Sequence, residues 1–398
     1  MTYGTSSIYL DHAATTPVDP GVVQAMMPLF TAVFGNPSSI YQVGQEGRAA
    51  IDRTRASIAR VLKCRSSEVL FTSGATESNN LAVKGVATSA RQRRAPGRDG
   101  PPHIVTTAIE HHAVLHPALA LEADGYAVTQ LPVDREGLVS PSDLAKAIRP
   151  ETCLVSIIHA NNEIGTVQPV AALARIARDR GVPLHVDAVQ AAGTLSIDVD
   201  ELGVDFLSLS AHKFYGPKGV GILYIRKGTP IRFLQNGGGQ ESGRRGGTEN
   251  VPLIVGMAEA LIRADRDRDV YNAHCRALRD RLWSLLEETI PDLLLNGPSL
   301  DGARLANNLN VSFRGVQGET ALLGLDMGGV AASAGSACTT GNTEPSHVLR
   351  AIGRSPEEAR ASIRFTVGRG NSEAEIDDAA SVIADVIGRT RTLAPAAV

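Results

Sequence analysis

Lys213 and Asp187 are the two residues whose type and surroundings point most directly to chemistry. Lys213 follows the apolar run 205–210 and precedes a Gly-Pro turn, so we expect it to be held at the edge of a sheet. Asp187 ends another apolar run, 26 residues earlier in the chain. A lysine amine and a carboxylate fixed at the ends of two strands suit pyridoxal phosphate. The amine forms a Schiff base with the aldehyde, and the carboxylate keeps the pyridine nitrogen protonated so that the ring withdraws electrons.

Cys338 and Arg364 are the candidates for chemistry on a substrate. Cys338 lies among small residues, without the apolar periodicity that would bury it, and this favours a nucleophile on a loop. The other cysteines, at 64, 153 and 275, are expected to be free thiols. Arg364 lies inside an apolar run, where a guanidinium needs an anionic partner. An amino-acid carboxylate and an internal carboxylate are equally good partners on this pattern alone.

Several polar residues are expected near these four. Thr76 lies in a glycine-bearing turn that opens a helix and could bind a phosphate, and the others follow predicted strands: Asn162, Gln190, Ser210 and His212. Each also has an ordinary structural reading as a cap or a turn residue, so only their combination carries weight. His111 and His112 follow another strand, and either could stack on a cofactor ring and move protons near neutral pH.

The elements that must position these residues alternate between helix and strand from about residue 50 to 230. Such alternation predicts a mainly parallel sheet covered by helices on both faces, with ligands bound beyond the carboxyl ends of the strands. The predicted strands are 68–72, 103–107, 153–158, 183–187, 206–210 and 219–224. After a long amphipathic stretch, a smaller α+β domain is predicted from strands at 308–313 and 362–366 and helices at 319–327 and 372–389.

The composition is that of an ordinary globular protein. The chain has 398 residues, 43% of them hydrophobic and 20% charged, with a formal net charge of −3. Near-neutral charge gives no reason to expect nucleic acid or a membrane as a partner. No signal peptide or membrane-length apolar run is recognisable, so we expect a cytoplasmic protein. The cysteines lack metal-ligand spacing, and no metal is expected.

The whole chain resembles the cysteine desulfurases of the NifS/IscS group, which are class V aminotransferases of fold type I, the pyridoxal-phosphate fold. The resemblance runs from residue 9 to the strand that contains Arg364. It rests on separate motifs: Tyr9-Leu-Asp-His-Ala-Ala-Thr-Thr-Pro, Gly35-Asn-Pro-Ser, Thr72-Ser-Gly-Ala-Thr-Glu-Ser, Asn161-Asn-Glu-Ile-Gly, His185-Val-Asp-Ala, His212-Lys, Arg245-Gly-Gly-Thr-Glu-Asn and Gly335-Ser-Ala-Cys-Thr.

The resemblance implies a role for each matched residue. Lys213 would carry the cofactor, Asp187 would pair with its ring nitrogen, and His111 would stack on the ring in preference to His112. Further cofactor contacts would come from Ala75, Thr76, Asn162, Gln190, Ser210 and His212, and from Thr248 across a homodimer interface. The substrate carboxylate would be held by Arg364 with Asn36 and Asn162 beside it.

The implied activity is removal of sulfur from L-cysteine to give L-alanine and a persulfide on Cys338, which passes to a sulfur-acceptor protein. Lys213 would also remove the α-proton. The residues after Cys338 are similar to the longer-looped branch of the group, for which we expect direct delivery. From the last residues of the sequence, we expect the C-terminal extension with which housekeeping members dock the iron–sulfur scaffold to be missing. Iron–sulfur assembly, tRNA thiolation and DNA phosphorothioation are therefore all open as destinations.

The expected fold is a mainly parallel seven-stranded sheet in a large cofactor-binding domain, residues 17–262. A smaller α+β domain, residues 1–16 and 263–398, would carry the cysteine loop. Two other functions stay open. A selenocysteine lyase of the same fold would need no protein cysteine, whereas a sulfur-relay or scaffold protein would mainly bind a partner. The Lys213–Asp187 pair argues against the second.

Overall fold

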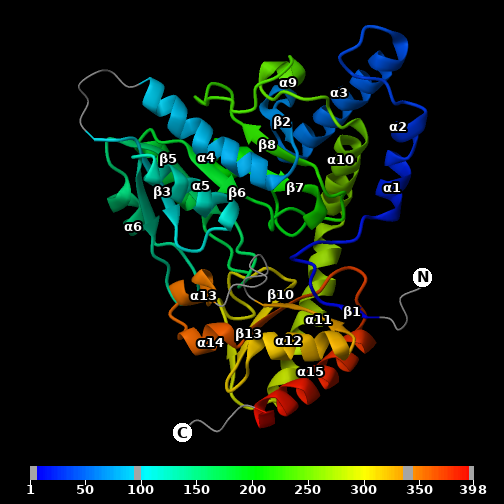
Figure 1. Ribbon diagram of the computed structural model, residues 1–398, viewed down its shortest axis with the longest axis vertical. Helices are drawn as coiled ribbons and strands as arrows, with labels where there is room; N and C mark the ends of the chain where they lie inside the picture. The colour runs from blue at the N-terminus through cyan, green and yellow to red at the C-terminus, as the bar shows by residue number, and fades with distance from the viewer. Residues whose placement is uncertain (1–6, 94–99, 335–343, 394–398) are drawn as a thin grey trace.

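The computed structural model describes residues 7–93, 100–334 and 344–393 (Figure 1). Its strands form one large sheet, one small sheet and a two-stranded ribbon. The large sheet with its helices occupies the upper part of Figure 1, and the small sheet lies below it with the C-terminal helix. The α/β class expected from the sequence is confirmed.

The large sheet has seven strands in the described part of the chain, ordered β2-β8-β7-β6-β5-β3-β4. Strands β7, β6, β5, β3 and β4 run parallel, and β8 is antiparallel to both of its neighbours. The expected mainly parallel, seven-stranded sheet is thus confirmed. Its strands are β2 (Val69–Thr72), β3 (His103–Thr107), β4 (Ala127–Leu131), β5 (Thr152–Ile158), β6 (Leu184–Asp187), β7 (Phe206–Ser210) and β8 (Gly221–Ile225).

Helices cover both faces of this sheet because successive strand residues point to opposite sides. In β7, for example, Phe206 packs into the cluster with α4 and α5, whereas Leu207 packs into the cluster with α3, α7 and α10. The helices around the sheet are α1 (Pro20–Met26), α2 (Pro28–Thr31), α3 (Gln42–Leu62), α4 (Ala75–Gln92), α5 (His112–Ala123), α6 (Pro141–Ala147), α7 (Val170–Asp179), α8 (Val199–Leu202), α9 (Gln240–Gly243) and α10 (Val251–Arg266). Short 3₁₀ turns, η1 (Ser66–Glu68) and η2 (Ala211–Lys213), adjoin β2 and β7.

The small sheet has the strand order β12-β13-β10-β9 and encloses a hydrophobic cluster of its own with α11 and α15. Its strands are β9 (Leu293–Leu295), β10 (Asn308–Phe313), β12 (Ser333–Ala334) and β13 (Ser362–Thr366). The ribbon pairs β1 (Ile8–Tyr9) with β11 (Val330–Ala331), so the start of the described chain lies beside its last third. The accompanying helices are α11 (Arg268–Thr289), α12 (Gly318–Met327), α13 (His347–Ala351), α14 (Pro356–Arg360) and α15 (Glu373–Leu393).

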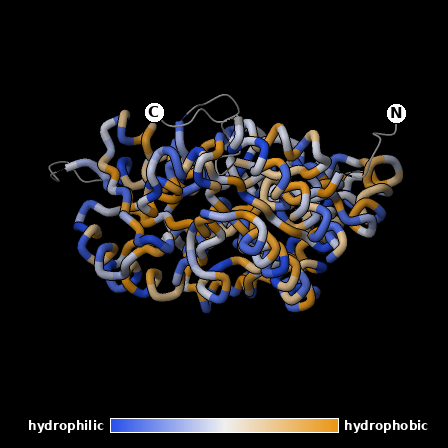
Figure 2. The backbone as a smooth tube through the Cα atoms, turned by 90° about the horizontal axis from the view of Figure 1, so that it is seen from below, coloured by the Kyte–Doolittle hydropathy of each residue, from blue (hydrophilic) through white to orange (hydrophobic). Residues whose placement is uncertain are grey.

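Two separate apolar clusters support the division into a large domain, 17–262, and a small domain, which we keep as a proposal. The amphipathic stretch from 251 to 289 is two helices, α10 and α11, which meet at Asp267. Figure 2 shows the trace changing between hydrophobic and hydrophilic residues within most segments, as expected for elements that bury one face. In the part of the chain that the structure describes, no helix is long and apolar enough to cross a membrane.

Candidate active site

A cavity of about 620 Å³ lies at the carboxyl ends of the parallel strands. Ten of the residues singled out in the sequence line it, although they come from segments far apart in the chain: Ala75, Thr76, His111, Asn162, Asp187, Gln190, Ser210, His212, Lys213 and Arg364. This position is where a parallel sheet is expected to bind its ligand, because strand ends and helix starts meet there.

Lys213 is held at one side of the cavity by the N-terminal segment. It ends η2, the 3₁₀ turn that directly follows β7. Its Nζ donates hydrogen bonds to the backbone oxygens of Ala13 at 2.6 Å and Ala14 at 2.7 Å. Gln190 Nε2 donates to the same Ala13 oxygen at 2.9 Å. The amine is therefore positioned by a segment about 200 residues away in sequence.

Asp187 ends β6 and is almost completely buried. Its two oxygens accept hydrogen bonds from Asn79 Nδ2 at 2.7 Å and from the backbone nitrogen of Val189 at 3.1 Å. Burial raises the pKa of this carboxyl, while these two hydrogen bonds and the Lys213 charge oppose the rise. A cationic ring nitrogen placed against it would favour the ionised carboxylate.

The start of α4 forms another wall of the cavity. Gly74 precedes the helix with φ of 154°, and no side chain caps the helix, so its first amides are not used by a capping group. A Cβ at Gly221 would lie 2.7 Å from the Gly74 backbone, so the two glycines allow the loop to approach β8. Thr76, Ser210 and His212 line the same region. Together these amides and hydroxyls suit a phosphate group.

His111 enters the cavity as the N-cap of α5. Its Nδ1 accepts a hydrogen bond from the backbone nitrogen of Ala113 at 3.0 Å, so the neutral ring carries its proton on Nε2. Burial, and next the charge of Lys213, lower the pKa of His111 to about 4. His112 does not line the cavity and instead stacks on His116, with ring centroids 4.7 Å apart.

Glu110, directly before His111, is fully buried. Its Oε1 accepts from the hydroxyl of Thr107 and the backbone nitrogen of Ile158, both at 2.8 Å. Burial raises the pKa of Glu110 to about 8, and the nearby Asp187 adds to the rise. Glu110 therefore holds its proton at neutral pH much more tightly than an exposed glutamate does.

Arg364 lies on β13, lines the cavity and is 1% exposed. Its guanidinium donates to the backbone oxygen of Asn162 and to Asp11 Oδ1, each at 2.8 Å. Its Nε has no hydrogen-bond partner among the described residues. A guanidinium carries five N–H donors, so donors remain for a second carboxylate. Arg364 can therefore bind both kinds of partner that the sequence allowed at the same time: the internal carboxylate of Asp11 and the carboxylate of a ligand.

Three predicted residues remain, of which the structure describes two. Asn36 and Thr248 are exposed and do not line the cavity of the single chain. Cys338 lies outside the described residues. The roles of all three stay predictions. The other cysteines are free thiols, as expected, and Cys275 is buried. Within the described ranges, no cluster of histidine, cysteine and acidic residues could hold a metal ion.

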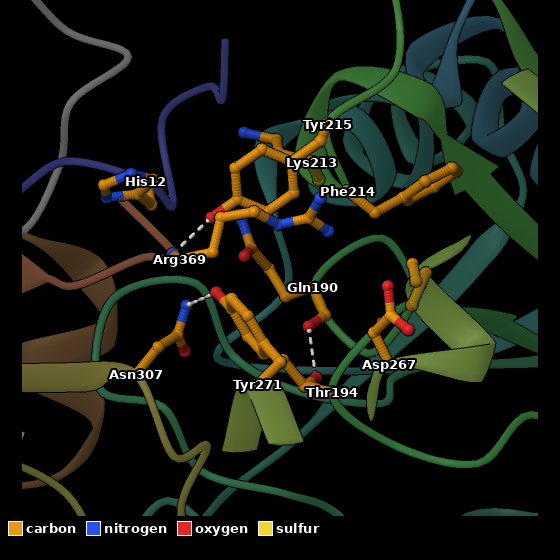
Figure 3. A pocket seen from close by; sticks show the side chains of 13 residues that line it. His12, Gln190, Thr194, Lys213, Phe214, Tyr215, Asp267, Tyr271, Asn307 and Arg369 are labelled. Carbon is orange, nitrogen blue, oxygen red and sulfur yellow. Dashed lines mark hydrogen bonds between the residues drawn. The ribbon is translucent and has the colours of Figure 1, made fainter. Parts of the chain in front are cut away.

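Figure 3 shows a second, much smaller cavity of about 20 Å³, which shares Lys213 and Gln190 with the larger one. Tyr215 Oη accepts from the backbone nitrogen of Arg369 at 2.9 Å, and Asn307 Nδ2 donates to Tyr271 Oη at 3.4 Å. The space suits about one water molecule. It is too small for a substrate. The residues around it pack against Lys213 and Gln190, which also line the larger cavity.

The sequence and the fold are those of a known family. The family described as Aminotransferase class-V matches residues 8–378. The chain belongs to this family. The cysteine desulfurase IscS of Dictyoglomus turgidum is 50% identical over 388 residues, which cover 98% of this chain and 96% of the relative. At this identity and coverage, the chain belongs with the cysteine desulfurases of the family.

Solved structures of related proteins agree with this placement. A NifS-like protein superposes with a TM-score of 0.89 at 39% identity, covering 96% of this chain and 100% of the other. The structure of SspA in complex with cysteine superposes with a TM-score of 0.79 at 37% identity, covering 91% of this chain and 99% of the other. The resemblance to the NifS/IscS group inferred from the motifs is therefore confirmed.

Members of the class V aminotransferase family depend on pyridoxal phosphate. The residues of the cavity fit this cofactor. They provide an amine for the aldehyde, a buried carboxylate for the ring nitrogen and a glycine-bounded helix start for the phosphate. The buried Oδ1 of Asn79 has no hydrogen-bond partner in the described part of the chain and lines the same cavity. A polar ligand would supply that partner.

Four residues in or beside the cavity were missed in the sequence. Asn79 lines the cavity, Asp11 pairs with Arg364, Glu110 directly precedes His111, and Glu163 directly follows Asn162. Asn79 could have been found, because it lies one helical turn after Thr76 and so on the same face of α4. Asp11 lies in the first motif of the resemblance, but nothing in the sequence links it to Arg364. That contact depends on the pairing of segments 353 residues apart.

Proposed function

We propose that this chain removes sulfur from L-cysteine, leaves it as a persulfide on Cys338 and releases L-alanine. The observation that carries the proposal is the single cavity in which a lysine amine, a buried carboxylate and a buried arginine with spare donors converge. The relative named cysteine desulfurase and the structure of SspA with cysteine support the choice of substrate.

The cofactor would be pyridoxal phosphate, held by Lys213 at its aldehyde, Asp187 at its ring nitrogen and the start of α4 at its phosphate. When bound, it withdraws electrons from the α-carbon of an attached amino acid and so lets that carbon lose a proton. Lys213, next to the cavity, would accept that proton. His111 is neutral and can place its ring in the cavity without adding a positive charge.

The remaining groups act on the substrate. Arg364 would take its carboxylate with the free Nε and a further N–H. The Cys338 thiolate would attack the substrate sulfur, so that a sulfur–sulfur bond forms and the Cβ–sulfur bond breaks. The Cβ atom gains the electron pair and a proton and becomes the methyl group of alanine. No outside oxidant or reductant is needed.

The direct test follows both products. The holoenzyme supplied with L-cysteine should form L-alanine and a persulfide on Cys338, read by amino-acid analysis and by mass spectrometry. Cys338→Ser should keep the visible absorbance of the cofactor and form neither product. Continued alanine formation by this variant would contradict the proposal and favour a lyase that needs no protein cysteine.

We also infer a homodimer. Thr248 is exposed in the single chain, as required of a residue that would complete a partner's phosphate site. Exposed apolar side chains gather on α1, α2 and the segment that follows: Val23, Met27, Phe30, Phe34, Ile40 and Tyr41. Ile40 is 93% exposed, which is unusual for an isoleucine unless another surface covers it. Analytical sedimentation should show a dimer. The variant Thr248→Ala should bind the cofactor more weakly and should remain a dimer. A monomeric holoenzyme would overturn this inference.

We propose that the sulfur acceptor is a protein of one of three pathways: iron–sulfur assembly, tRNA thiolation or DNA phosphorothioation. A cytoplasmic location stays a prediction from the sequence. Labelled sulfur from cysteine, chased from Cys338 into purified candidates from each pathway, would identify the destination by which protein takes up the label.

A further inference from the structure

Two serine hydroxyls, one on each side of the segment that contains Cys338, donate hydrogen bonds to carboxylates. Ser333 Oγ donates to Asp11 Oδ2 at 2.6 Å, and Ser346 Oγ donates to Glu163 Oε2 at 2.5 Å. Ser346 is buried and Ser333 partly so. Ser333 precedes Cys338 by five residues and Ser346 follows it by eight. We call these two hydrogen bonds the serine clasps.

Both serine clasps are connected to Arg364, one directly and one through a neighbouring residue. Asp11 forms an ion pair with the guanidinium at 2.8 Å. Glu163 directly follows Asn162, whose backbone oxygen accepts from Arg364 at 2.8 Å. Burial raises the pKa of Glu163 to about 7. The hydrogen bond from Ser346 and the positive charge of Arg364 both oppose this rise. The residue expected to bind the substrate carboxylate is therefore connected to both clasps.

The backbone strengthens the connection at the first clasp. Ser333 on β12 is the cross-strand partner of Arg364 on β13, so the two side chains leave the same face of the small sheet. At the second clasp, Ser346 also caps α13, where its Oγ accepts from the backbone nitrogen of Leu349 at 3.2 Å. Glu163 is tied in turn to β10, because its backbone oxygen accepts from Asn308 and Asn310. Each clasp thus joins a flank of the cysteine segment to rigid structure.

We propose that Asp11 and Glu163 are positioning residues, which through Ser333 and Ser346 fix both flanks of the Cys338 segment relative to the substrate carboxylate at Arg364. The inference rests on the proposed function and deepens it. Sulfur transfer needs the thiolate and the substrate sulfur in line, and a misplacement of about 1 Å can slow such a step by about a hundredfold. Substrate binding does not need that alignment, so the clasps act on transfer and not on affinity.

The test uses Ser333→Ala and Ser346→Ala in the full-length holoenzyme. Affinity for L-alanine, followed by the visible absorbance of the cofactor, is expected to stay within about twofold of wild type. The rate of persulfide formation on Cys338, measured by rapid quench and mass spectrometry, is expected to fall about tenfold in each variant. Ser333→Thr and Ser346→Thr keep a hydroxyl and should restore most of the rate.

Ser355→Ala is the matched control. Ser355 caps α14 as Ser346 caps α13, and its Oγ accepts from the backbone nitrogen of Glu358 at 3.1 Å. Its side-chain hydrogen bonds are with Glu357 and Glu358, away from both clasps. It should lower thermal stability as a lost helix cap does and leave persulfide formation unchanged. Wild-type rates in both clasp variants, or a loss of affinity as large as the loss of rate, would overturn the inference.

A second readout does not depend on turnover. Saturating L-alanine places a carboxylate at Arg364, and we expect it to change the rate at which iodoacetamide alkylates Cys338 in the wild type by about threefold or more. In the double variant Ser333→Ala/Ser346→Ala, alanine should have no such effect. If L-alanine does not change the alkylation rate of Cys338 in the wild type, the inference is wrong, even when desulfuration has been demonstrated. Conversely, absence of any persulfide in the wild type would contradict the proposed function. The alkylation experiment would then still test whether the serine clasps connect Arg364 to Cys338.

Discussion

The two ends of the active-site cavity are built in different ways. The cofactor end uses residues that end strands of the large sheet or lie three positions after them: Asp187, Gln190, Ser210 and Lys213. The carboxylate end, made by Arg364, Asp11 and Asn162, joins residues 202 and 353 positions apart. Each residue of the first end can be recognised from local sequence, although Ala13 and Ala14 of the distant N-terminal segment hold Lys213 in place. At the second end, the pairing of Arg364 with Asp11 has no local signal. A change at the cofactor end should therefore remove the chemistry, and a change at the carboxylate end should mainly alter recognition.

The strongest test of this difference is Lys213→Ala. Loss of the amine removes both the attachment of the cofactor and the proton acceptor, so desulfuration should fall by at least about a thousandfold. Borohydride reduction and peptide mapping should find the pyridoxyl label on Lys213 in the wild type. Lys218→Ala is the control, because Lys218 also lines the cavity but is exposed. Equal activity losses in both variants would show that the cofactor end does not depend on one amine.

A buried ion pair that does not line the cavity should contribute strongly to stability. Arg55 holds Glu241 with two hydrogen bonds of 2.6 and 2.8 Å, and Glu241 also accepts from the backbone of Phe71. Arg55→Met leaves a buried, unpaired carboxylate and should lower the free energy of unfolding by about 3–5 kcal/mol. Arg48→Met breaks the exposed pair with Asp52 and should cost less than about 1 kcal/mol. Denaturant titrations that give similar losses for the two variants would refute the contrast.

At the carboxylate end, Arg364→Lys keeps the charge and loses the planar fork. The KM for L-cysteine should rise about 10- to 100-fold, with a smaller change in kcat, because the lost hydrogen bonds serve mainly to hold the carboxylate. Inhibition by L-alanine should weaken by a similar factor. If instead kcat falls and KM stays constant, Arg364 belongs with the chemistry and the two ends are not functionally distinct.

The smallest expected effect concerns Glu110, next to the cofactor end. Its pKa is raised to about 8 in the folded chain, above the ordinary value near 4.5, so the folded state holds its proton more tightly than the unfolded state. This contribution to stability is complete below about pH 4.5 and declines as the pH rises toward 8, with a slope of up to about 1 kcal/mol per pH unit. Glu110→Gln should give a flatter stability profile between pH 5 and 8. An unchanged slope would mean that Glu110 ionises normally.

The contrast also explains what could be predicted from the sequence. Strands β3 and β7 were found because continuous apolar runs with β-branched residues signal buried strands. Strand β4 was missed, since it is an edge strand whose Thr129 and Gln130 remain partly or fully exposed and give little apolar signal. The cofactor end followed from strand ends alone. At the carboxylate end Arg364 was recognised as needing an anion, but Asp11 as its partner required the pairing of β12, β13 and the N-terminal segment, which no local pattern reports.

The N-terminal segment supplies backbone oxygens to Lys213 and Gln190, and the carboxylate of Asp11 to Arg364. During synthesis it is among the first parts to leave the ribosome, yet its partners β11 and Thr366 are made near the end. Contacts of such long sequence separation form late in folding. The nascent chain therefore cannot complete these contacts before translation is almost finished, so the pocket is assembled only when nearly the whole chain is present.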